Sequence, residues 1–359
     1  MRMTLCVVLL ALGCSSSDPA VRYTTGSAAS IDSSAVELIV LRDEVGGLEA
    51  AIAPSKGGEL SGLRVRHAGR WIETLQLARD YSPREGFGGK GPLLWPATGR
   101  NFPPDLEERR RAGESFNDGA YDHRGVRRRM PIHGFARDLP WTVEQVSSDT
   151  ASARALLSLL DTSDTRDMYP FRFRCSVEYA VVDGRLELRY TVAADPGNSE
   201  PMFFSIGNHV TFVAPLLEGS DPHRMVLKTA ASTELLKTPY GIPTGEAQPA
   251  PPFASGMHLG EHLPLSATSL TGYPSGQDPQ VEYRDPAGLS LHISHSASHA
   301  PSPPAVLFNL WGDVRGGFFS PEPWIGLQNS LVRREGLVHV DPGGTFLWTV
   351  RIWHEPREA

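Results

Sequence analysis

Two histidines stand in apolar, strand-like surroundings and are candidates for proton transfer. His133 lies in the segment 130–137, which reads MPIHGFAR, and His209 lies in the segment 203–212, which reads FFSIGNHVTF. The pKa of a free imidazole is close to neutral pH, so either ring could act as a general acid or base. Each histidine has Gly or Asn and aromatic residues beside it, which favours a position on the floor of a cleft. Other histidines in strand-like runs are interpreted as structural hydrogen bonders: His292, His295, His299 and His339.

Further residues could complete a sugar site around these histidines. The segment 92–100 reads PLLWPATGR and provides Arg100, and the segment 323–329 reads PWIGLQN and provides Gln328, where a general base would need a carboxylate. Aromatic rings stack on the apolar face of sugars, although most aromatic residues in such runs are core. The aromatic candidates are Trp95, Phe135, Phe212, Trp311 and Trp324. Of these, Trp311 is predicted to bind the substrate.

Short β-rich runs between turn signals must position these residues. The chain of 359 residues holds 35 Gly and 30 Pro, which suits a turn-rich β architecture. The runs 177–182 and 186–192 flank Asp183-Gly184, a pair that supplies the positive φ angles of a two-residue hairpin turn. No long stretch has helical periodicity. The sequence therefore predicts one large β-sandwich over residues 35–357.

Further strands are predicted along the chain from their β-rich composition. They span residues 36–41, 48–53, 142–146, 151–160, 226–229, 281–283, 289–293, 306–311 and 346–353. The Pro- and Gly-rich span 239–264 is predicted to be an extended loop. Residues 15–34 are rich in Ser, Ala, Gly and Thr, and they are predicted to be a flexible tether.

Several segments resemble the aldose 1-epimerases, or galactose mutarotases, and they occur in the order typical of that family. The HGFAR segment at 133–137, followed by Trp141, is the most specific of them. The others are APSKGGEL at 53–60, LLWP with Gly99-Arg100, SIGNH at 205–209 with Phe212, and PWIGL at 323–327 followed by Gly336-Leu337 and Pro342-Gly343-Gly344. The resemblance extends over residues 36–354.

The resemblance implies an all-β fold, the galactose-mutarotase-like β-supersandwich, and exchange of sugar anomers. In such enzymes a glutamate takes the proton from the C1 hydroxyl while a histidine protonates the ring oxygen. The ring opens, the C1–C2 bond rotates, and reclosure gives the other anomer. By this resemblance His209 matches the acid, and His133 and Arg100 match the residues that grip sugar hydroxyls. The implied partner is a free hexose or the terminal sugar of a glycan, and no cofactor is implied.

The chain departs from the family pattern at the base. The glutamate of the family belongs to a Glu-Pro pair after an apolar strand, and the same place here reads Gln328-Asn329. An amide cannot act as a general base at ordinary pH, and loss of a general base typically costs about 10²- to 10⁴-fold in rate. The sugar-binding aspartate of the family also has no match that can be fixed within residues 265–278.

Three explanations of Gln328 are open at this point. Gln328 occupies the base position, which would leave a sugar-binding or slow protein. Alternatively, Glu322 supplies the carboxylate, because an even offset keeps both side chains on one face of a strand. Against this, Pro321 and Pro323 predict a poor continuous strand. The third explanation recruits a carboxylate from elsewhere, with Asp313 or Glu335 as candidates.

The leading functional hypothesis is an aldose 1-epimerase of a free hexose. Its alternative is a non-catalytic carbohydrate-binding lipoprotein that lacks the general base. An epimerase of phosphorylated hexoses would need cations such as Arg127, Arg128 and Arg129, but an exported location argues for unphosphorylated sugars. Accessory domains of polysaccharide lyases and glycoside hydrolases share such folds. Because of the HGFAR segment, this is the least favoured of the hypotheses.

The N-terminus is predicted to be a lipoprotein signal. Arg2 precedes a short apolar stretch, and residues 11–14 read ALGC, which resembles a bacterial lipobox. The signal peptide would span residues 1–13, Cys14 would be acylated, and the tether would end at residue 34; an ordinary secretory signal is the alternative. The predicted location is the cell envelope, anchored in the outer membrane and facing the periplasm. Ser15 favours that membrane, because it is not the aspartate associated with inner-membrane retention.

The net charge, the histidines and the cysteines bear on which other classes of function are possible. The formal charge of -7 provides no basic footprint for nucleic acid. The 12 histidines are scattered without ligand spacing, so no metal site is predicted. Cys175 lies in a strand-like run and is interpreted as a small buried apolar group.

Overall fold

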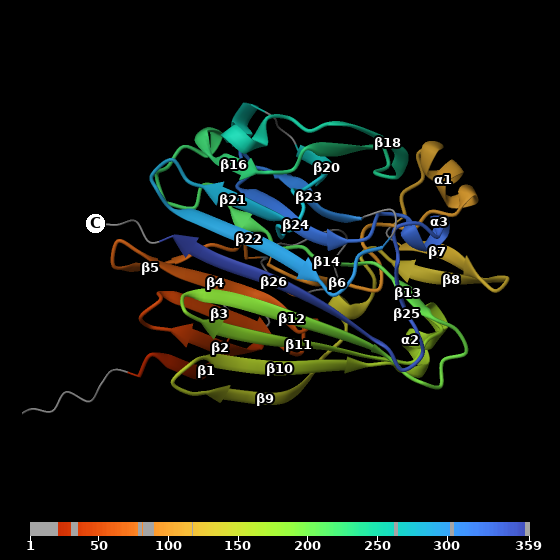
Figure 1. The fold of residues 1–359 in the computed structure, drawn as a ribbon, viewed down its shortest axis with the longest axis horizontal. Coiled ribbons are helices and arrows are strands. Elements are labelled where there is room, and N and C mark those ends of the chain that lie inside the picture. Colours follow the sequence, from red (N-terminus) through yellow and green to blue (C-terminus); the bar gives the residue numbers. More distant parts are fainter. Residues whose placement is uncertain are drawn as a thin grey trace, which may run out of the picture.

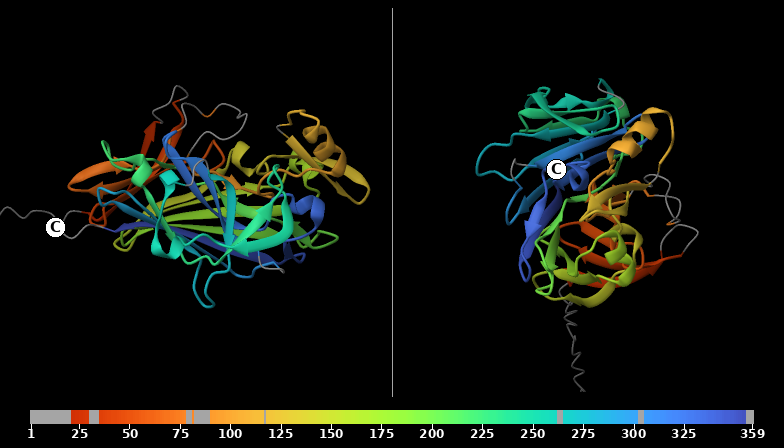
Figure 2. Two further views of the ribbon diagram at one scale, coloured as in Figure 1. Left: turned by 90° about the horizontal axis from the view of Figure 1, so that it is seen from above. Right: turned by 90° about the vertical axis from the view of Figure 1, so that its right-hand side faces the viewer.

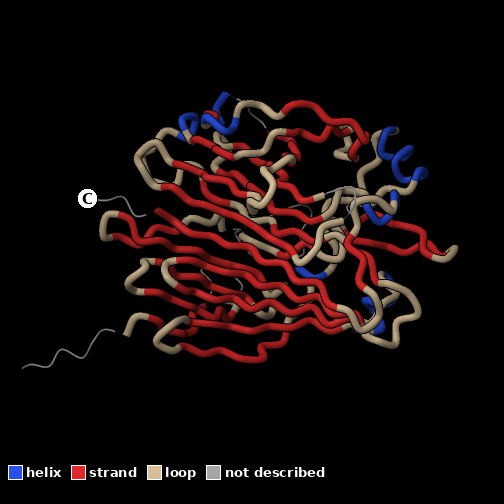
Figure 3. The backbone as a smooth tube through the Cα atoms, viewed as in Figure 1, coloured by secondary structure: helices blue, strands red, loops and turns tan. Residues whose placement is uncertain are grey.

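Antiparallel strands make up most of the computed structural model (Figure 1 and Figure 3). It describes residues 21–29, 35–77, 81, 90–116, 118–261, 265–301 and 305–355. The predicted signal peptide and Cys14 lie outside these residues. Within them, no helix combines the length and the apolar character that a membrane span requires.

A nine-stranded sheet forms the largest layer. In spatial order its strands are β19 (Met257–His258), β16 (Val226–Thr229), β21 (Gln280–Arg284), β22 (Ser290–Ala297), β26 (Thr345–Glu355), β12 (Arg185–Ala194), β11 (Phe173–Val182), β10 (Ala153–Leu160) and β9 (Thr142–Ser148). The predicted hairpin joins β11 to β12, and Asp183 and Gly184 have φ angles of 48° and 68° in its turn. Alternate residues of β12 are buried, as its hydrophobic pattern predicts.

An eight-stranded sheet carries the candidate site residues. In order its strands are β18 (Pro243–Pro249), β17 (Thr233–Lys237), β20 (Leu265–Thr271), β23 (Val306–Asp313), β24 (Phe318–Ile325), β14 (Ile206–Asn208) and β6 (Leu93–Leu94), and β15 (Phe212–Val213) also pairs with β24. The prediction of a loop over residues 239–264 is wrong for β18 and β19. β18 is an edge strand whose prolines lie at its two ends, where a missing N–H is tolerated.

A five-stranded sheet forms a third layer, and it corrects the predicted tether. Its strands are β1 (Tyr23–Ala29), β2 (Glu37–Asp43), β3 (Leu48–Ala53), β4 (Glu59–His67) and β5 (Arg70–Glu73). β1 lies inside the span 14–34, and all of its residues pair with β2. Tyr23 is 1% exposed, and its hydroxyl donates to Asp183 Oδ1 at 3.3 Å. Strand pairing and this buried tyrosine order a segment whose small residues show no periodicity.

Short elements connect the three sheets. They are the pair β13 (Met202–Phe204) and β25 (Val338–Val340), the pair β7 (Asp118–His123) and β8 (Val126–Pro131), the helices α1 (Pro104–Arg111), α2 (Ser163–Met168) and α3 (Ser330–Arg333), and the 3₁₀ turns η1 (Ala136–Asp138), η2 (Pro222–Arg224), η3 (Phe253–Ser255) and η4 (Leu259–Glu261). The arginine run 127–129 belongs to β8. Arg127 forms surface ion pairs with Asp105 and Asp122, at 3.0 and 2.6 Å.

The nine-stranded sheet is a shared layer against which the other two sheets pack (Figure 2). On one half, the hydroxyl of Tyr179 in β11 donates to the carbonyl of Gly58 before β4, at 2.8 Å. On the other half, Phe212 of β15 stacks on Tyr283 of β21 with ring centroids 5.8 Å apart. One continuous hydrophobic core fills the space between the layers. Cys175 is fully buried in that core, and burial raises its pKa, which confirms its apolar role.

Candidate active site

A cavity of about 230 Å³ gathers the candidate residues on the eight-stranded sheet. All five residues that sequence reasoning assigned to chemistry or sugar contact line it: Arg100, His133, His209, Trp311 and Gln328. Gly99, Ile132, Asn309, Glu322 and Trp324 complete its lining. Residues far apart in the sequence therefore meet at one site.

A break in strand pairing presents His209 to this cavity. β14 and β15 pair with the two ends of β24, and the residues between them form backbone hydrogen bonds with the segment before β6. There the N–H of His209 donates to the carbonyl of Pro92 at 3.0 Å, and that of Thr211 donates to the carbonyl of Lys90 at 2.9 Å. The hydroxyls of Thr211 and Ser320 are 2.6 Å apart and tie this segment to β24. His209 is only 4% exposed.

Glu322 of β24 brings a buried carboxylate to this break. β24 runs through Pro321 and Pro323, so the expectation of a poor strand there is wrong. Among the described residues, β14 and β15 pair with β24 only on either side of these prolines, so the missing N–H groups cost no ladder bonds to those strands. Glu322 is 1% exposed, and its Oε1 lies 3.4 Å from Nε2 of His209. A carboxylate therefore stands beside the candidate acid.

Two neutral donors fix the Glu322 carboxylate. The indole Nε1–H of Trp324 donates to Oε2 at 3.1 Å, and the Nδ2 of Asn309 donates to Oε1 at 3.4 Å. Burial raises the pKa of Glu322 well above its usual value, while the Asn309 hydrogen bond, the charge of Lys237 and the Trp324 hydrogen bond lower it. A raised pKa makes the ionised carboxylate a stronger base.

Sequence reasoning missed Asn309. It lies directly opposite Glu322 in the register of β23 and β24, and it is 4% exposed. Its alternation with Trp311, two residues along the same strand, places both side chains on one face. That spacing is the signal in the sequence that could have indicated Asn309.

His133 lies edge-on to His209, with ring centroids 5.4 Å apart and an interplanar angle of 85°. The backbone N–H of Gly99 donates to its Nδ1 at 3.0 Å, so the neutral ring carries its proton on Nε2. Burial lowers the pKa of His133 well below its usual value, and the nearby charge of Arg137 adds to this effect. His133 is therefore suited to donate one hydrogen bond as a neutral imidazole.

Gln328 lines the cavity in surroundings that suit an amide. Its Nε2 donates to the carbonyl of Tyr240 at 2.9 Å. Backbone packs closely on both sides, since a Cβ at Gly99 would lie 2.6 Å from Oε1 and one at Gly241 would lie 2.8 Å from Nε2. A carboxylate at this position could not donate to the Tyr240 carbonyl.

Arg100 contributes a cation to the cavity. Its Nε is buried and has no hydrogen-bond partner in the part of the chain that the structure describes. Burial and the charge of Arg110 lower its pKa, but a guanidinium stays charged at neutral pH. The guanidinium of Arg100 can therefore donate hydrogen bonds to a ligand oxygen from its nitrogens that line the cavity.

The remaining sequence candidates lie elsewhere. Asp313 accepts the backbone N–H of Arg315 at 3.0 Å, Glu335 pairs with Arg333 at 2.7 Å, and neither carboxylate lines the cavity. Of the aromatic candidates, Trp324 lines the cavity together with Trp311. The other three are core residues that are at most 2% exposed: Trp95, Phe135 and Phe212.

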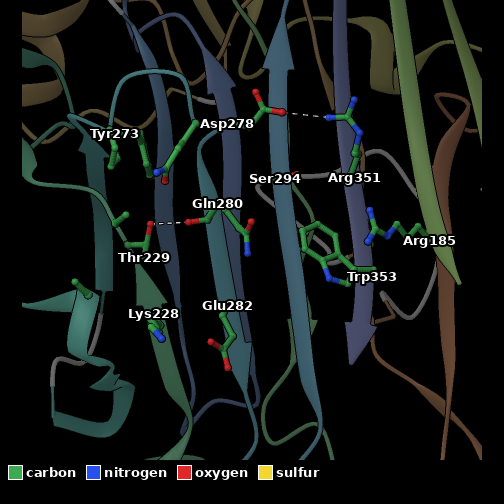
Figure 4. A pocket seen from close by; sticks show the side chains of 14 residues that line it. Arg185, Lys228, Thr229, Tyr273, Asp278, Gln280, Glu282, Ser294, Arg351 and Trp353 are labelled. Atoms are coloured by element: carbon green, nitrogen blue, oxygen red, sulfur yellow. Dashed lines mark hydrogen bonds and ion pairs between the residues drawn. The ribbon is translucent and has the colours of Figure 1, made fainter. Parts of the chain in front are cut away.

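A larger cavity of about 640 Å³ lies on the outer face of the nine-stranded sheet (Figure 4). Two of its arginines have partners on the sheet face: Arg351 lies 3.4 Å from Asp278, and the Arg185 guanidinium lies 5.4 Å from the Trp353 ring centroid. None of the residues assigned to acid–base chemistry is among its described lining residues. The smaller cavity is therefore the candidate active site.

The fold defines an all-β protein of the galactose mutarotase-like class. The Slr1438 protein from Synechocystis is 23% identical with a TM-score of 0.68, over 93% of this chain and 100% of that chain. A galactose mutarotase-like protein from Clostridium acetobutylicum is 17% identical with a TM-score of 0.70, over 92% and 99%. A galactose 1-epimerase from Lactobacillus acidophilus is 15% identical with a TM-score of 0.65, over 93% and 99%. These likenesses confirm the predicted fold.

A sequence model identifies the family. The model of the aldose 1-epimerase family matches residues 110–299, which is more than half of the chain. The protein therefore belongs to the aldose 1-epimerase family. A search of curated proteins gives no match.

Proposed function

We propose that this protein is an aldose 1-epimerase that interconverts the α and β anomers of a free hexose, with His209 as the acid and Glu322 as the base. The supporting observation is the Glu322 carboxylate, 3.4 Å from Nε2 of His209 in a cavity that also holds Arg100 and His133. Membership of the family gives the class of reaction. This assignment moves the base from Gln328 to Glu322, the second of the three explanations open at the sequence level.

The proposed reaction conserves protons over one cycle. The Glu322 carboxylate removes the proton of the C1 hydroxyl while protonated His209 delivers a proton to the ring oxygen. The bond between C1 and the ring oxygen breaks, and C1 becomes an aldehyde carbon. After rotation about the C1–C2 bond, His209 recovers its proton from the released hydroxyl and Glu322 returns its proton to the carbonyl oxygen. Paired acid and base avoid a free alkoxide or oxocarbenium ion.

The other cavity residues orient the sugar in this proposal. The Nε2–H of neutral His133 and the guanidinium of Arg100 donate to sugar oxygens. The half-buried Trp311 ring, 5.5 Å from that of His209, offers an apolar contact to the sugar face. The amide of Gln328 contributes its Oε1 as an acceptor while Nε2 remains bound to the Tyr240 carbonyl.

Anomer exchange measured by polarimetry or NMR with several hexoses tests the proposal. We expect Glu322→Gln to lower kcat by about 10²- to 10⁴-fold, the usual effect of removing a general base. The cavity keeps its shape in this variant, so sugar binding should persist. A wild-type protein that binds hexose but exchanges anomers no faster than buffer would support the non-catalytic carbohydrate-binding alternative.

We further propose that the protein is anchored in the bacterial outer membrane through acylated Cys14, facing the periplasm. The support is the lipobox-like ALGC after a short apolar stretch. Incorporation of a labelled fatty acid tests this proposal. Label that persists in Cys14→Ser would contradict it.

A further inference from the structure

A row of polar side chains crosses the eight-stranded sheet and ends at Glu322. The register of the strands places Ser269 of β20 opposite Asn309 of β23, and Asn309 opposite Glu322 of β24. Lys237, near the end of β17, reaches the same row: its Nζ donates to Asn309 Oδ1 at 2.8 Å. Ser269, Asn309 and Glu322 are each at most 4% exposed. The row is therefore a buried network that leads from a lysine to the proposed base.

The two donors on Asn309 determine which way its amide faces. Lys237 Nζ and Ser269 Oγ both approach Oδ1, at 2.8 and 3.0 Å. An ammonium group has only donors, so it requires the oxygen of the amide and would be opposed by the NH₂ group. The Nδ2 group must then point to the other side, where it meets Glu322 Oε1 at 3.4 Å. Lys237 therefore fixes the orientation in which the Asn309 amide donates a hydrogen bond to Glu322.

We infer that Lys237 is a positioning residue for the general base: it orients Asn309 toward Glu322 and supplies the positive charge that favours the ionised carboxylate. This inference rests on the proposed function for its catalytic consequence, but its effect on Glu322 can be measured without activity. Lys237 is not among the residues that line the cavity, so it acts through Asn309 and through its charge.

The electrostatics of the pair agree with this geometry. The charge of Lys237 is one of the effects that lower the pKa of Glu322 against the larger effect of burial. Burial in turn lowers the pKa of Lys237 to about 8, against the charges of Glu322 and Glu234. The amine is thus mostly protonated at neutral pH. The other charged or titratable groups around the pair are His209 beside Glu322, with His133 and Arg100 also lining the cavity.

Replacing the lysine tests the inference through the titration of Glu322. The carboxyl of Glu322 is followed by infrared difference spectroscopy, and its band is identified by its loss in Glu322→Gln. In Lys237→Met the lowering effect of the cation is removed, so the titration midpoint of Glu322 should rise. Lys237→Arg retains the cation, and its midpoint should remain near that of the wild type. Lys228→Met, on the outer face of the nine-stranded sheet, is the matched control that should change nothing.

Activity gives a second reading. If Glu322 must be ionised, the acid limb of the kcat profile should move to higher pH in Lys237→Met, with KM little changed. Each unit of that shift lowers kcat about tenfold below the pKa.

A Glu322 midpoint equal to that of the wild type in Lys237→Met would overturn the inference. If Lys237→Met does not fold, the same titration in Lys237→Gln decides, because its amide can still donate to Asn309 while the positive charge is gone, so the midpoint should also rise. A shifted midpoint in a protein without epimerase activity would reject the proposed function and leave the inference standing.

Discussion

At the scale of single residues, Gln328 and Glu322 differ in the hydrogen bonds that hold their side chains. Gln328 donates to a backbone carbonyl, whereas Glu322 receives donors from Asn309 and Trp324. We expect Gln328→Glu to gain no epimerase activity, because Glu322 already provides the base in the proposed mechanism. The variant loses the hydrogen bond to the Tyr240 carbonyl, which is part-buried, so the free energy of unfolding should fall by about 1 kcal/mol, the usual net contribution of a hydrogen bond. Urea unfolding and anomer exchange measure both effects.

A matched control separates this site from a general effect of added charge. Gln145 is exposed on β9, and Gln145→Glu should leave stability and exchange unchanged. A rate gain in Gln328→Glu would instead show that position 328 is the vacated base. The sequence alone could not decide between Gln328 and Glu322 as the base. Pro321 and Pro323 argue against a strand only where a neighbouring strand needs their N–H groups. Whether such a neighbour is present beside β24 becomes visible only in the folded sheet.

At the scale of elements, the gap between β14 and β15 is the feature that lets His209 face Glu322. Thr211 and Ser320 are fully buried, and their hydroxyls bond across this gap at 2.6 Å. We expect Thr211→Val to cost about 1–3 kcal/mol in unfolding free energy, because the Ser320 hydroxyl loses a partner. The rate of anomer exchange should fall as His209 loosens. The double variant Thr211→Val with Ser320→Ala should be less destabilised than the sum of the two single variants; full additivity would contradict the coupling.

Local signals explain which elements the sequence predicts well. The Asp183-Gly184 hairpin is recognised because its turn needs positive φ angles that these residues supply. β1 and β18 were missed because pairing with β2 and β17, and not their own periodicity, makes them strands. Lys237 was missed for a related reason. In the register of β17 and β20 it is Leu235 that lies opposite Ser269, and Lys237 reaches Asn309 only through its long side chain, which no sequence pattern indicates.

At the scale of the whole molecule, the shared nine-stranded layer buries histidines that take no part in the proposed chemistry. His295 of β22 is fully buried between the sheets, and the Trp348 indole donates to its Nδ1 at 3.2 Å. Burial lowers its pKa from 6.5 to about 3. The unfolded chain therefore binds a proton below pH 6.5 that the folded protein does not accept. Stability from this group is complete above that pH and is lost as the pH falls toward about 3, by about 1.4 kcal/mol per unit.

The contribution of His295 can be isolated by comparing pH slopes. Glu73 and Glu322 have pKa values raised by burial, so they act with the opposite sign and partly offset the histidine in the wild type. In His295→Leu the unfolding free energy at pH 7 should fall, because the Trp348 indole loses its acceptor. Between pH 6.5 and 5, however, the free energy of unfolding of the variant should fall by about 2 kcal/mol less than that of the wild type. The reason is that the unfolded variant has no histidine at position 295 to take up a proton. Urea unfolding across this range measures the difference. Equal slopes would mean that His295 accepts its proton inside the fold.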